Sequence, residues 1–207
     1  GHRMFSGIVE CTGKISKIDN HGDIFSIEVY CPKGFNENLE NGASISIDGV
    51  CLTSKDNGDN ALKFDIVGET INRTKFSEMA IGDEVNLERS IKASSEIGGH
   101  LMSGHIHCTG KVIRTDIRKN SKDILIEISD KYLPYLMEKG YIGINGCSLT
   151  LGKIVDNSFY IHLIPETLKI TNINELDLQD LVNIEIDQNT IAIVDTVKKV
   201  LLAQKSS

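Results

Sequence analysis

The chain has 207 residues, with 22 Lys or Arg against 29 Asp or Glu, so its formal charge is −7. With 40% hydrophobic and 25% charged residues, its composition is typical of a soluble globular protein. The acidic balance lacks the basic stripe that nucleic-acid binding needs, and no apolar run approaches the roughly 18 residues of a membrane span. We therefore expect no nucleic-acid and no membrane partner.

The start of the chain and its cysteines bear on where the protein works. Gly1-His2-Arg3 precede Met4 and are typical of an expression-tag remnant, and no signal peptide is recognisable. The five cysteines are an odd number without CxxC spacing, which favours reduced thiols over a disulfide framework. The sequence therefore predicts a cytoplasmic protein.

A duplication organises the chain, with an offset of 97 residues between its two copies. Residues 4–15 align with residues 101–112, and six of these twelve positions are identical. The same offset matches three further pairs of segments, 47–53 with 144–150, Glu69-Thr70 with Glu166-Thr167, and 83–88 with 180–185. So long a repeat predicts two homologous domains, 4–99 and 100–188, with a tail at 189–207.

Both copies have the pattern of β-structure. Six segments alternate apolar and polar residues, the period of a half-buried strand: Ile24–Val29, Leu62–Ile66, Val85–Glu88, Ile124–Ile128, Phe159–Leu163 and Val182–Ile186. Turn signals separate them at short intervals, and no long helical period is present. The fold class predicted is all-β, with a small closed barrel in each copy. Short helical turns are expected at Leu39-Glu40 and Leu133–Lys139.

The tail differs from the repeats. From Thr190 to Gln204, apolar residues recur at helical spacing, at Ile193, Val194, Val197, Val200 and Leu201. This predicts a helix with no counterpart in the first copy. It could strap its own barrel, but we favour a contact with another subunit, because a lone terminal apolar stripe needs a partner.

The sequence shows no common nucleotide-binding or nucleophile motif. His100, His105 and His107 form its densest histidine cluster, and His105 and His107 are expected on one strand face. No neighbouring cluster of Cys or carboxylates completes a ligand set, so we expect hydrogen-bonding histidines, no metal and no cofactor.

The positions that both copies retain are more informative. Ser-Gly, Cys-Thr-Gly-Lys, Gly-x-x-Leu-Thr and Glu-Thr all occur twice. Turns and barrel corners favour Gly, Ser and Thr for structural reasons. Equally, a hydroxyl-rich ligand bound once per repeat would use the hydrogen bonds of Ser and Thr and the close approach that Gly permits. From the residues alone both explanations stay open.

Through these motifs the chain resembles the riboflavin synthase family from Met4 to its C-terminus. The resemblance rests on Met4–Val9, Ser46–Thr53, Glu96–Ile106, Gly140–Thr150, His162–Leu168 and Asn183–Asp187. It implies two six-stranded Greek-key barrels, each binding a lumazine, and a C-terminal α-helix that holds a homotrimer together. It also implies that the site forms between the N-terminal barrel of one subunit and the C-terminal barrel of another.

The activity that the resemblance implies is a dismutation without metal or redox cofactor. One molecule of 6,7-dimethyl-8-ribityllumazine gives a four-carbon unit to a second, which yields riboflavin and 5-amino-6-ribitylamino-uracil. The 7-methyl group is acidic because the ring delocalises the carbanion, so alignment of the two rings supplies much of the rate.

Two sets of substrate-binding residues follow from the resemblance. The first pocket is expected at Gly7, Ile8, Val9, Ser44, Val50, Cys51, Leu52, Thr53, Asp65, Ile66, Val67, Gly68, Glu69 and Thr70. The second is expected at Gly104, His105, Ile106, Lys139, Ser148, Leu149, Thr150, Leu163, Ile164, Pro165, Glu166, Thr167 and Leu168. The copies differ at Ile8 and His105, Cys51 and Ser148, and Asp48 and Asn145, an asymmetry that suits one donor and one acceptor.

For proton transfer or nucleophile activation we expect Cys51, His105, Ser148 and Asp187, without an assignment of steps. Three of them have a simpler explanation: Cys51 as a small buried hydrophobe, Ser148 as a turn residue, and Asp187 as a helix cap, which is compatible with catalysis. Two other function classes stay open. One is a lumazine carrier like the luminescence proteins. The other is a flavin-reductase barrel, for which the chain lacks a nucleotide-binding domain.

Overall fold

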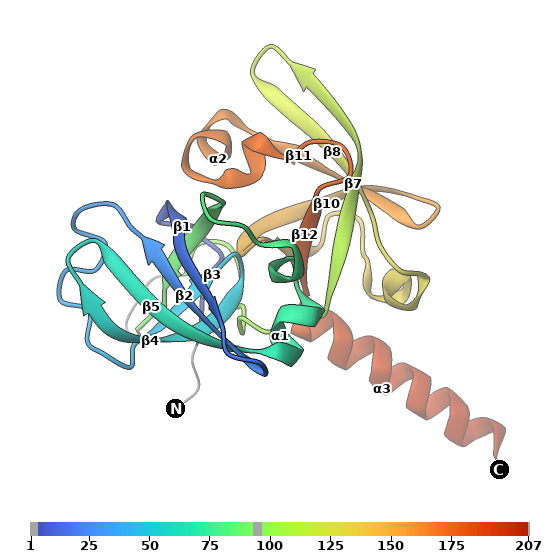
Figure 1. Ribbon diagram of the computed structural model, residues 1–207. Helices are drawn as coiled ribbons and strands as arrows, with labels where there is room; N and C mark the ends of the chain where they lie inside the picture. The colour runs from blue at the N-terminus through green and yellow to red at the C-terminus, as the bar shows by residue number, and fades with distance from the viewer. Residues whose placement is uncertain (1–3, 93–96, 207) are drawn as a thin grey trace.

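The computed structural model describes residues 4–92 and 97–206, and within them twelve strands form two closed antiparallel barrels (Figure 1). Gly1-His2-Arg3, assigned above to an expression tag, and Glu96, part of one matching motif, lie outside the described residues. Within the described ranges, no helix is long and apolar enough to cross a membrane.

The first barrel joins its strands in the order β1-β2-β5-β4-β3-β6. Their bounds are β1 (Cys11–Asn20), β2 (Ile24–Tyr30), β3 (Ser44–Ile47), β4 (Val50–Gly58), β5 (Ala61–Val67) and β6 (Glu84–Arg89), with α1 (Gly68–Arg73) and a 3-10 turn η1 (Lys75–Glu78) between β5 and β6. Strand β5 shows why the sequence folds this way. Leu62, Phe64 and Ile66 are buried, at about 1.5–3 kcal/mol for each large apolar side chain, whereas Asp65 and Val67 face outward.

The second barrel repeats the same connectivity, as a duplication requires. Its strands are β7 (Cys108–Arg118), β8 (Ser121–Glu127), β9 (Tyr141–Ile144), β10 (Cys147–Val155), β11 (Ser158–Leu163) and β12 (Leu181–Ile186). Three short helical elements connect them, η2 (Asp130–Tyr135), α2 (Pro165–Ile170) and η3 (Asn172–Glu175). The six strands predicted from alternation are confirmed, except that β8 ends one residue before Ile128.

The barrels meet through two hairpin turns that occupy matched positions. Asp48-Gly49 joins β3 to β4 and Asn145-Gly146 joins β9 to β10, and all four residues have positive φ, as a two-residue type I′ turn requires. A Cβ on Gly49 would lie 2.7 Å from the backbone nitrogen of Gly146. Glycine is therefore required here for the turn and for the close approach of the two barrels.

Reciprocal hydrogen bonds fix the two turns against each other. Asn86 Nδ2 donates to the carbonyl of Asn145, and its counterpart Asn183 donates to the carbonyl of Asp48, both at 2.9 Å. Asp48 is fully buried, and its carboxylate pairs with Lys75 Nζ at 2.8 Å. Such satisfied buried polar groups give the interface between the barrels one defined geometry.

Each barrel also receives a segment that precedes the first strand of the other. Val9 packs in the core of the second barrel, and Ile106 packs against the core of the first. Phe5 and Met102 bridge these two segments through paired backbone hydrogen bonds. The predicted boundaries 4–99, 100–188 and 189–207 stay a prediction, because packing around these segments does not follow the chain order.

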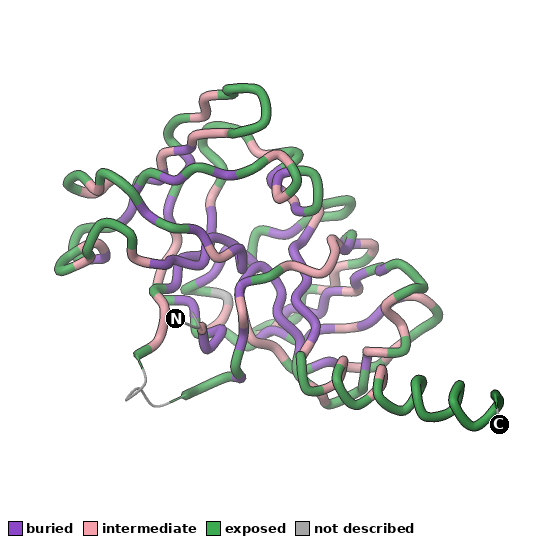
Figure 2. The backbone as a smooth tube through the Cα atoms, turned by 90° about the horizontal axis from the view of Figure 1, so that it is seen from below, coloured by how far each residue is buried: buried purple, intermediate pink, exposed green. Residues whose placement is uncertain are grey.

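The tail forms α3 (Gln188–Lys205), close to the predicted range, with Asp187 as its N-cap accepting from Asn189 N at 3.4 Å. It projects away from both barrels (Figure 1), and its surface is exposed along most of its length (Figure 2). Ile193 is 66% exposed and Leu202 is 64% exposed. Within the described residues, this apolar stripe therefore does not strap the second barrel.

The helical turns were predicted with less success. Leu39-Glu40 is not helical, because Asn38 takes a left-handed backbone (φ 59°) that ends the preceding turn. The turn expected over Leu133–Lys139 is instead η2, which begins earlier and ends at Tyr135. Lys139 itself has a φ of 69°, outside the helical region.

Candidate functional site

Two buried glutamates hold the repeated Ser-Gly motif. Glu88 accepts hydrogen bonds from the backbone nitrogens of Ser6 (2.9 Å) and Gly7 (3.0 Å). Its counterpart Glu185 accepts from those of Ser103 (2.9 Å) and Gly104 (2.8 Å). Burial raises the pKa of Glu88 and raises that of Glu185 to about 7, although these donors favour the charged form.

The Ser-Gly segments lie across the hairpin of the opposite barrel. Ser148 N donates to the carbonyl of Gly7 at 2.8 Å, and Cys51 N donates to that of Gly104 at 2.9 Å. The sequence had grouped Gly7 with Cys51 and Gly104 with Ser148. The contacts pair them the other way, so each candidate centre is built from both copies of the repeat.

Ser148 is part of a polar pair that sequence reasoning did not assemble. Its Oγ lies 2.6 Å from His100 Nδ1, and the His100 ring stacks on Tyr141 with centroids 5.0 Å apart and 14° between planes. Burial lowers the pKa of His100, and the nearby charge of Asp187 opposes this effect. The imidazole is thus held neutral in a fixed orientation, which suits it to exchange a proton with the Ser148 hydroxyl.

Cys51, in β4 of the first barrel, occupies the position that matches Ser148. It pairs with Ser46 across β3 and β4, two positions along from the pair of Ser44 and Thr53. Ser44 Oγ is buried without a hydrogen-bond partner among the described residues, and so is His100 Nε2. Two orphaned buried polar atoms at the candidate centres indicate groups that a ligand would satisfy.

Comparison with known proteins agrees with this architecture. The model of the lumazine binding domain family matches residues 6–90 and 103–187. Riboflavin synthase of Escherichia coli (strain K12) is 42% identical over 205 residues, covering 99% of this chain and 96% of that protein. The chain belongs to the riboflavin synthase family. Riboflavin synthase of Chlamydia pneumoniae is 38% identical and covers 96% of this chain and 97% of that one.

Solved structures extend this likeness to ligand-bound proteins. LumP complexed with riboflavin superimposes with a TM-score of 0.83 at 30% identity, covering 89% of this chain and all of that one. LumP complexed with 6,7-dimethyl-8-(1'-D-ribityl) lumazine gives a TM-score of 0.80 at 28% identity. The riboflavin synthase family and these structures therefore share the double barrel.

The apolar residues expected from the riboflavin synthase family fall into two groups, one with exposed side chains and one with buried side chains. Ile8 (53% exposed), Val67 (54%) and Ile164 (59%) present apolar side chains outward. Five others face the barrel interiors: Val9, Val50, Leu52, Ile66 and Leu163. These five could reach a ligand only through their backbone.

The remaining expected residues lie near the strand ends and in the short helices. Glu69 and Thr70 lie in α1, and Glu166 and Thr167 lie in α2 with Leu168, whose side chain is outside the described part of the structure. Lys139 is exposed in the turn before β9 and donates its backbone N–H to the carbonyl of Leu151.

The histidines do not form the strand-face cluster that the spacing suggested. His105 and His107 precede β7 and lie outside any regular element. His105 is exposed, and His107 Nδ1 accepts from Ile186 N at 3.0 Å. A cluster of His, Cys, Asp or Glu able to hold a metal is not found among residues 4–92 and 97–206.

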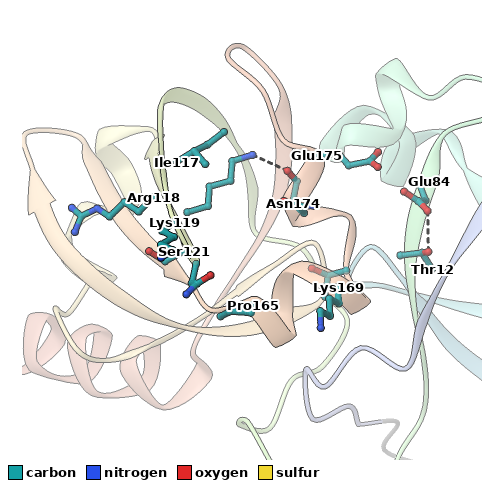
Figure 3. Close-up of a pocket in the computed structure, with 13 residues that line it drawn as sticks. Thr12, Glu84, Ile117, Arg118, Lys119, Ser121, Pro165, Lys169, Asn174 and Glu175 are labelled. Carbon is teal, nitrogen blue, oxygen red and sulfur yellow. Dashed lines mark hydrogen bonds between the residues drawn. The ribbon is translucent and has the colours of Figure 1, made fainter.

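Three hollows each include at least one of the expected site residues. One of about 790 Å³ is lined by Ile8 and Ser44, and one of about 960 Å³ by Val67, Gly68 and Glu69. A third, of about 580 Å³, lies between the β7–β8 hairpin, α2 and the first barrel (Figure 3). Of the expected site residues the third hollow includes only Pro165.

Sequence reasoning missed Glu88, Glu185 and Tyr141. The two glutamates carried a usable signal, because they match at the offset of 97 residues while lying on interior strands. A charged residue that is duplicated inside an apolar strand pattern needs buried donors. Tyr141 carried no such signal, because the residue that matches it in the first copy is Ser44.

Proposed function

We propose that this chain is a riboflavin synthase that binds two molecules of 6,7-dimethyl-8-ribityllumazine and transfers a four-carbon unit between them. The products are riboflavin and 5-amino-6-ribitylamino-uracil. The observation that carries the proposal is the pair of matched polar centres, Cys51 beside Gly104 and Ser148 beside Gly7. One substrate used twice in different roles needs two similar but unequal sites.

At the second centre, His100 and Ser148 move the proton of the 7-methyl group. Ser148 Oγ takes the methyl proton as its own hydroxyl proton passes to His100 Nδ1, which leaves a delocalised carbanion on the lumazine. This step requires the His100 tautomer that carries its proton on Nε2. The charge of Asp187 stabilises the imidazolium that forms.

At the first centre, Cys51 and His105 act on the other lumazine, as nucleophile and hydrogen-bonding partner. Exposed Ile8, which lines the same hollow as Ser44, offers apolar surface for a flat ring. Because the carbanion needs no strong base, holding the two rings in register contributes much of the rate.

The assembly that we propose is a homotrimer joined by α3, working in the cytoplasm. The exposed apolar stripe of α3 supports the subunit contact, because such a surface is unfavourable in water. The active site then forms between the first barrel of one subunit and the second barrel of its neighbour.

The decisive experiment is incubation of the protein with 6,7-dimethyl-8-ribityllumazine alone, with both products followed by chromatography. We expect riboflavin and 5-amino-6-ribitylamino-uracil in equal amounts. Cys51→Ala and Ser148→Ala are matched lesions, and each should abolish most turnover while an unreactive lumazine analogue still binds. Binding without any turnover in the unmodified protein would identify a lumazine carrier instead.

A further inference from the structure

The hollow of about 580 Å³ in Figure 3 lies between the two barrels, away from the residues expected to hold a lumazine. The β7–β8 hairpin and α2 form one side of it, and Glu84 of the first barrel lies on the other. Of α2 it includes Pro165 and Lys169, which are four residues apart and share a helix face. Thr167, two residues from each, lies on the opposite face of α2. The hollow is therefore distinct from the lumazine pocket expected at Thr167.

Lys122 is a buried cation without a carboxylate partner. It is 6% exposed, lines the hollow, and donates from Nζ to the carbonyls of Asn174 and Leu176, both at 2.8 Å. An ammonium group carries three N–H donors, and no partner for the third is found within residues 4–92 and 97–206. Buried lysines are normally paired with a negative charge. One donor and one positive charge at this hollow are therefore left unsatisfied.

Two further lysines add positive charge to the same hollow. Lys119 lies on the β7–β8 hairpin and Lys169 on α2, both are exposed, and neither has an ion-pair partner in the described part of the chain. Arg118 differs, because its Nη2 lies 3.0 Å from Asp123 Oδ2. Three lysines without a carboxylate partner indicate an anionic ligand, and lysine commonly binds phosphate as a point charge.

The first barrel shows that the fold itself does not require these cations. At the offset of 97 residues the counterparts of the three lysines are uncharged: Gly22, Phe25 and Asn72. Phe25 packs against the core of the first barrel, at the strand position that Lys122 occupies in the second. An apolar side chain is therefore sufficient at this position. The buried charge of Lys122 costs free energy unless a negative group pairs with it.

The opposite side of the hollow is acidic. Glu84 accepts from Thr12 Oγ1 at 3.0 Å, and Glu175 is the last residue of η3. Figure 3 shows these two glutamates at one side of the hollow and Arg118 and Lys119 at the other. Carboxylates accept hydrogen bonds from hydroxyl groups but repel a phosphate. A ligand that suits both sides therefore carries a phosphate group at one end and hydroxyl groups at the other.

We propose that this hollow is a further ligand site of the protein and binds a small sugar phosphate. Lys122, through its third N–H, holds the phosphate together with Lys119 and Lys169, and Glu84 and Glu175 accept from the sugar hydroxyls. The volume of about 580 Å³ is in the range of small-molecule sites. The site is independent of the proposed synthase activity, because none of these residues belongs to the candidate lumazine centres.

The test is isothermal titration calorimetry of the full chain with ribose 5-phosphate, inorganic phosphate and ribose, at low salt to limit screening. We expect one ribose 5-phosphate per chain, weaker binding of inorganic phosphate, and no binding of ribose. Lys122→Met removes the buried charge and should weaken ribose 5-phosphate by about tenfold or more. Lys33→Ala removes an exposed lysine of the first barrel that does not line the hollow, and it is the matched control.

A second variant keeps the test decisive if Lys122→Met does not fold. Lys119→Ala combined with Lys169→Ala changes exposed positions only and should also weaken ribose 5-phosphate about tenfold. Unchanged binding in this double variant, equal weakening in Lys33→Ala, or no binding to the unmodified protein would overturn the proposal.

Two competition results complete the test. Displacement of ribose 5-phosphate by an unreactive lumazine analogue would place it in a lumazine pocket and would also overturn the proposal. Inorganic phosphate bound as tightly as ribose 5-phosphate would refute the role of Glu84 and Glu175. The titrations measure no turnover, so a protein that binds ribose 5-phosphate as expected but forms no riboflavin would refute the synthase activity alone.

Discussion

The stability of the native fold should depend on pH because of Glu185. Replacing Glu185 by Gln should remove this dependence. Burial raises the pKa of this carboxyl from 4.5 to about 7, and the residue is only 2% exposed. The folded state therefore keeps a proton that the unfolded chain has already released above pH 4.5. The stability that this group contributes is fully present below pH 4.5 and is lost as the pH rises through 7.

The size of the effect follows from the same numbers. Each pKa unit corresponds to about 1.36 kcal/mol, so the rise from 4.5 to about 7 corresponds to about 3 kcal/mol of unfolding free energy. A loss of that size is a sizeable part of the roughly 5–15 kcal/mol that stabilises a typical domain.

The assay is urea unfolding at half-unit steps between pH 5 and pH 8. The difference in unfolding free energy between the native protein and Glu185→Gln should fall by about 2–3 kcal/mol across this range. Glu127→Gln removes the same charge from an exposed position on β8 and should leave the profile parallel to that of the native protein. Parallel profiles for Glu185→Gln as well would refute the reasoning.

Three other changes test the candidate site and the assembly. His100→Gln should lower riboflavin formation on the order of 10²-fold while the protein still binds an unreactive analogue, and normal turnover would exclude the His100–Ser148 pair from catalysis. Gly104→Ala should lower both stability and turnover, because its φ is 79° and the new Cβ would lie 2.5 Å from Cys51 Cβ; an unchanged melting temperature would contradict this. Deleting 188–207 should yield folded monomers by sedimentation, and an unchanged mass would exclude α3 as the subunit contact.

The fold could be predicted from the sequence where local pattern decides structure. Alternation located strands such as β5 and β11, because a closed barrel buries one face of every strand. The apolar stripe and Asp187 located α3. The six-residue helices α1 and α2 escaped prediction, since helices so short depend on tertiary contacts rather than on periodicity.

The site was less predictable because its contacts join distant parts of the chain. His100 and Ser148 are 48 residues apart, and nothing in their spacing indicates that one ring nitrogen meets the other's hydroxyl. The exchange of Val9 and Ile106 between barrels is equally hidden, because apolar residues in matched segments suit either core. Only the structure shows that Gly7 belongs with Ser148.

Comparison of the two copies distinguishes residues that the backbone framework requires from residues that two different roles for one substrate would require. Residues that hold the backbone are the same in both copies, as with Gly7 and Gly104 or Glu88 and Glu185, because the same loop must approach the same hairpin in each barrel. The copies diverge at partly or largely exposed positions that face outward, where Cys51 is matched by Ser148 and Asp65 by His162. A packing constraint alone would not place the changes there. Divergence of polar groups over an unchanged scaffold is what a reaction between two copies of one molecule demands, since the two pockets must bind the same shape but stabilise different charges.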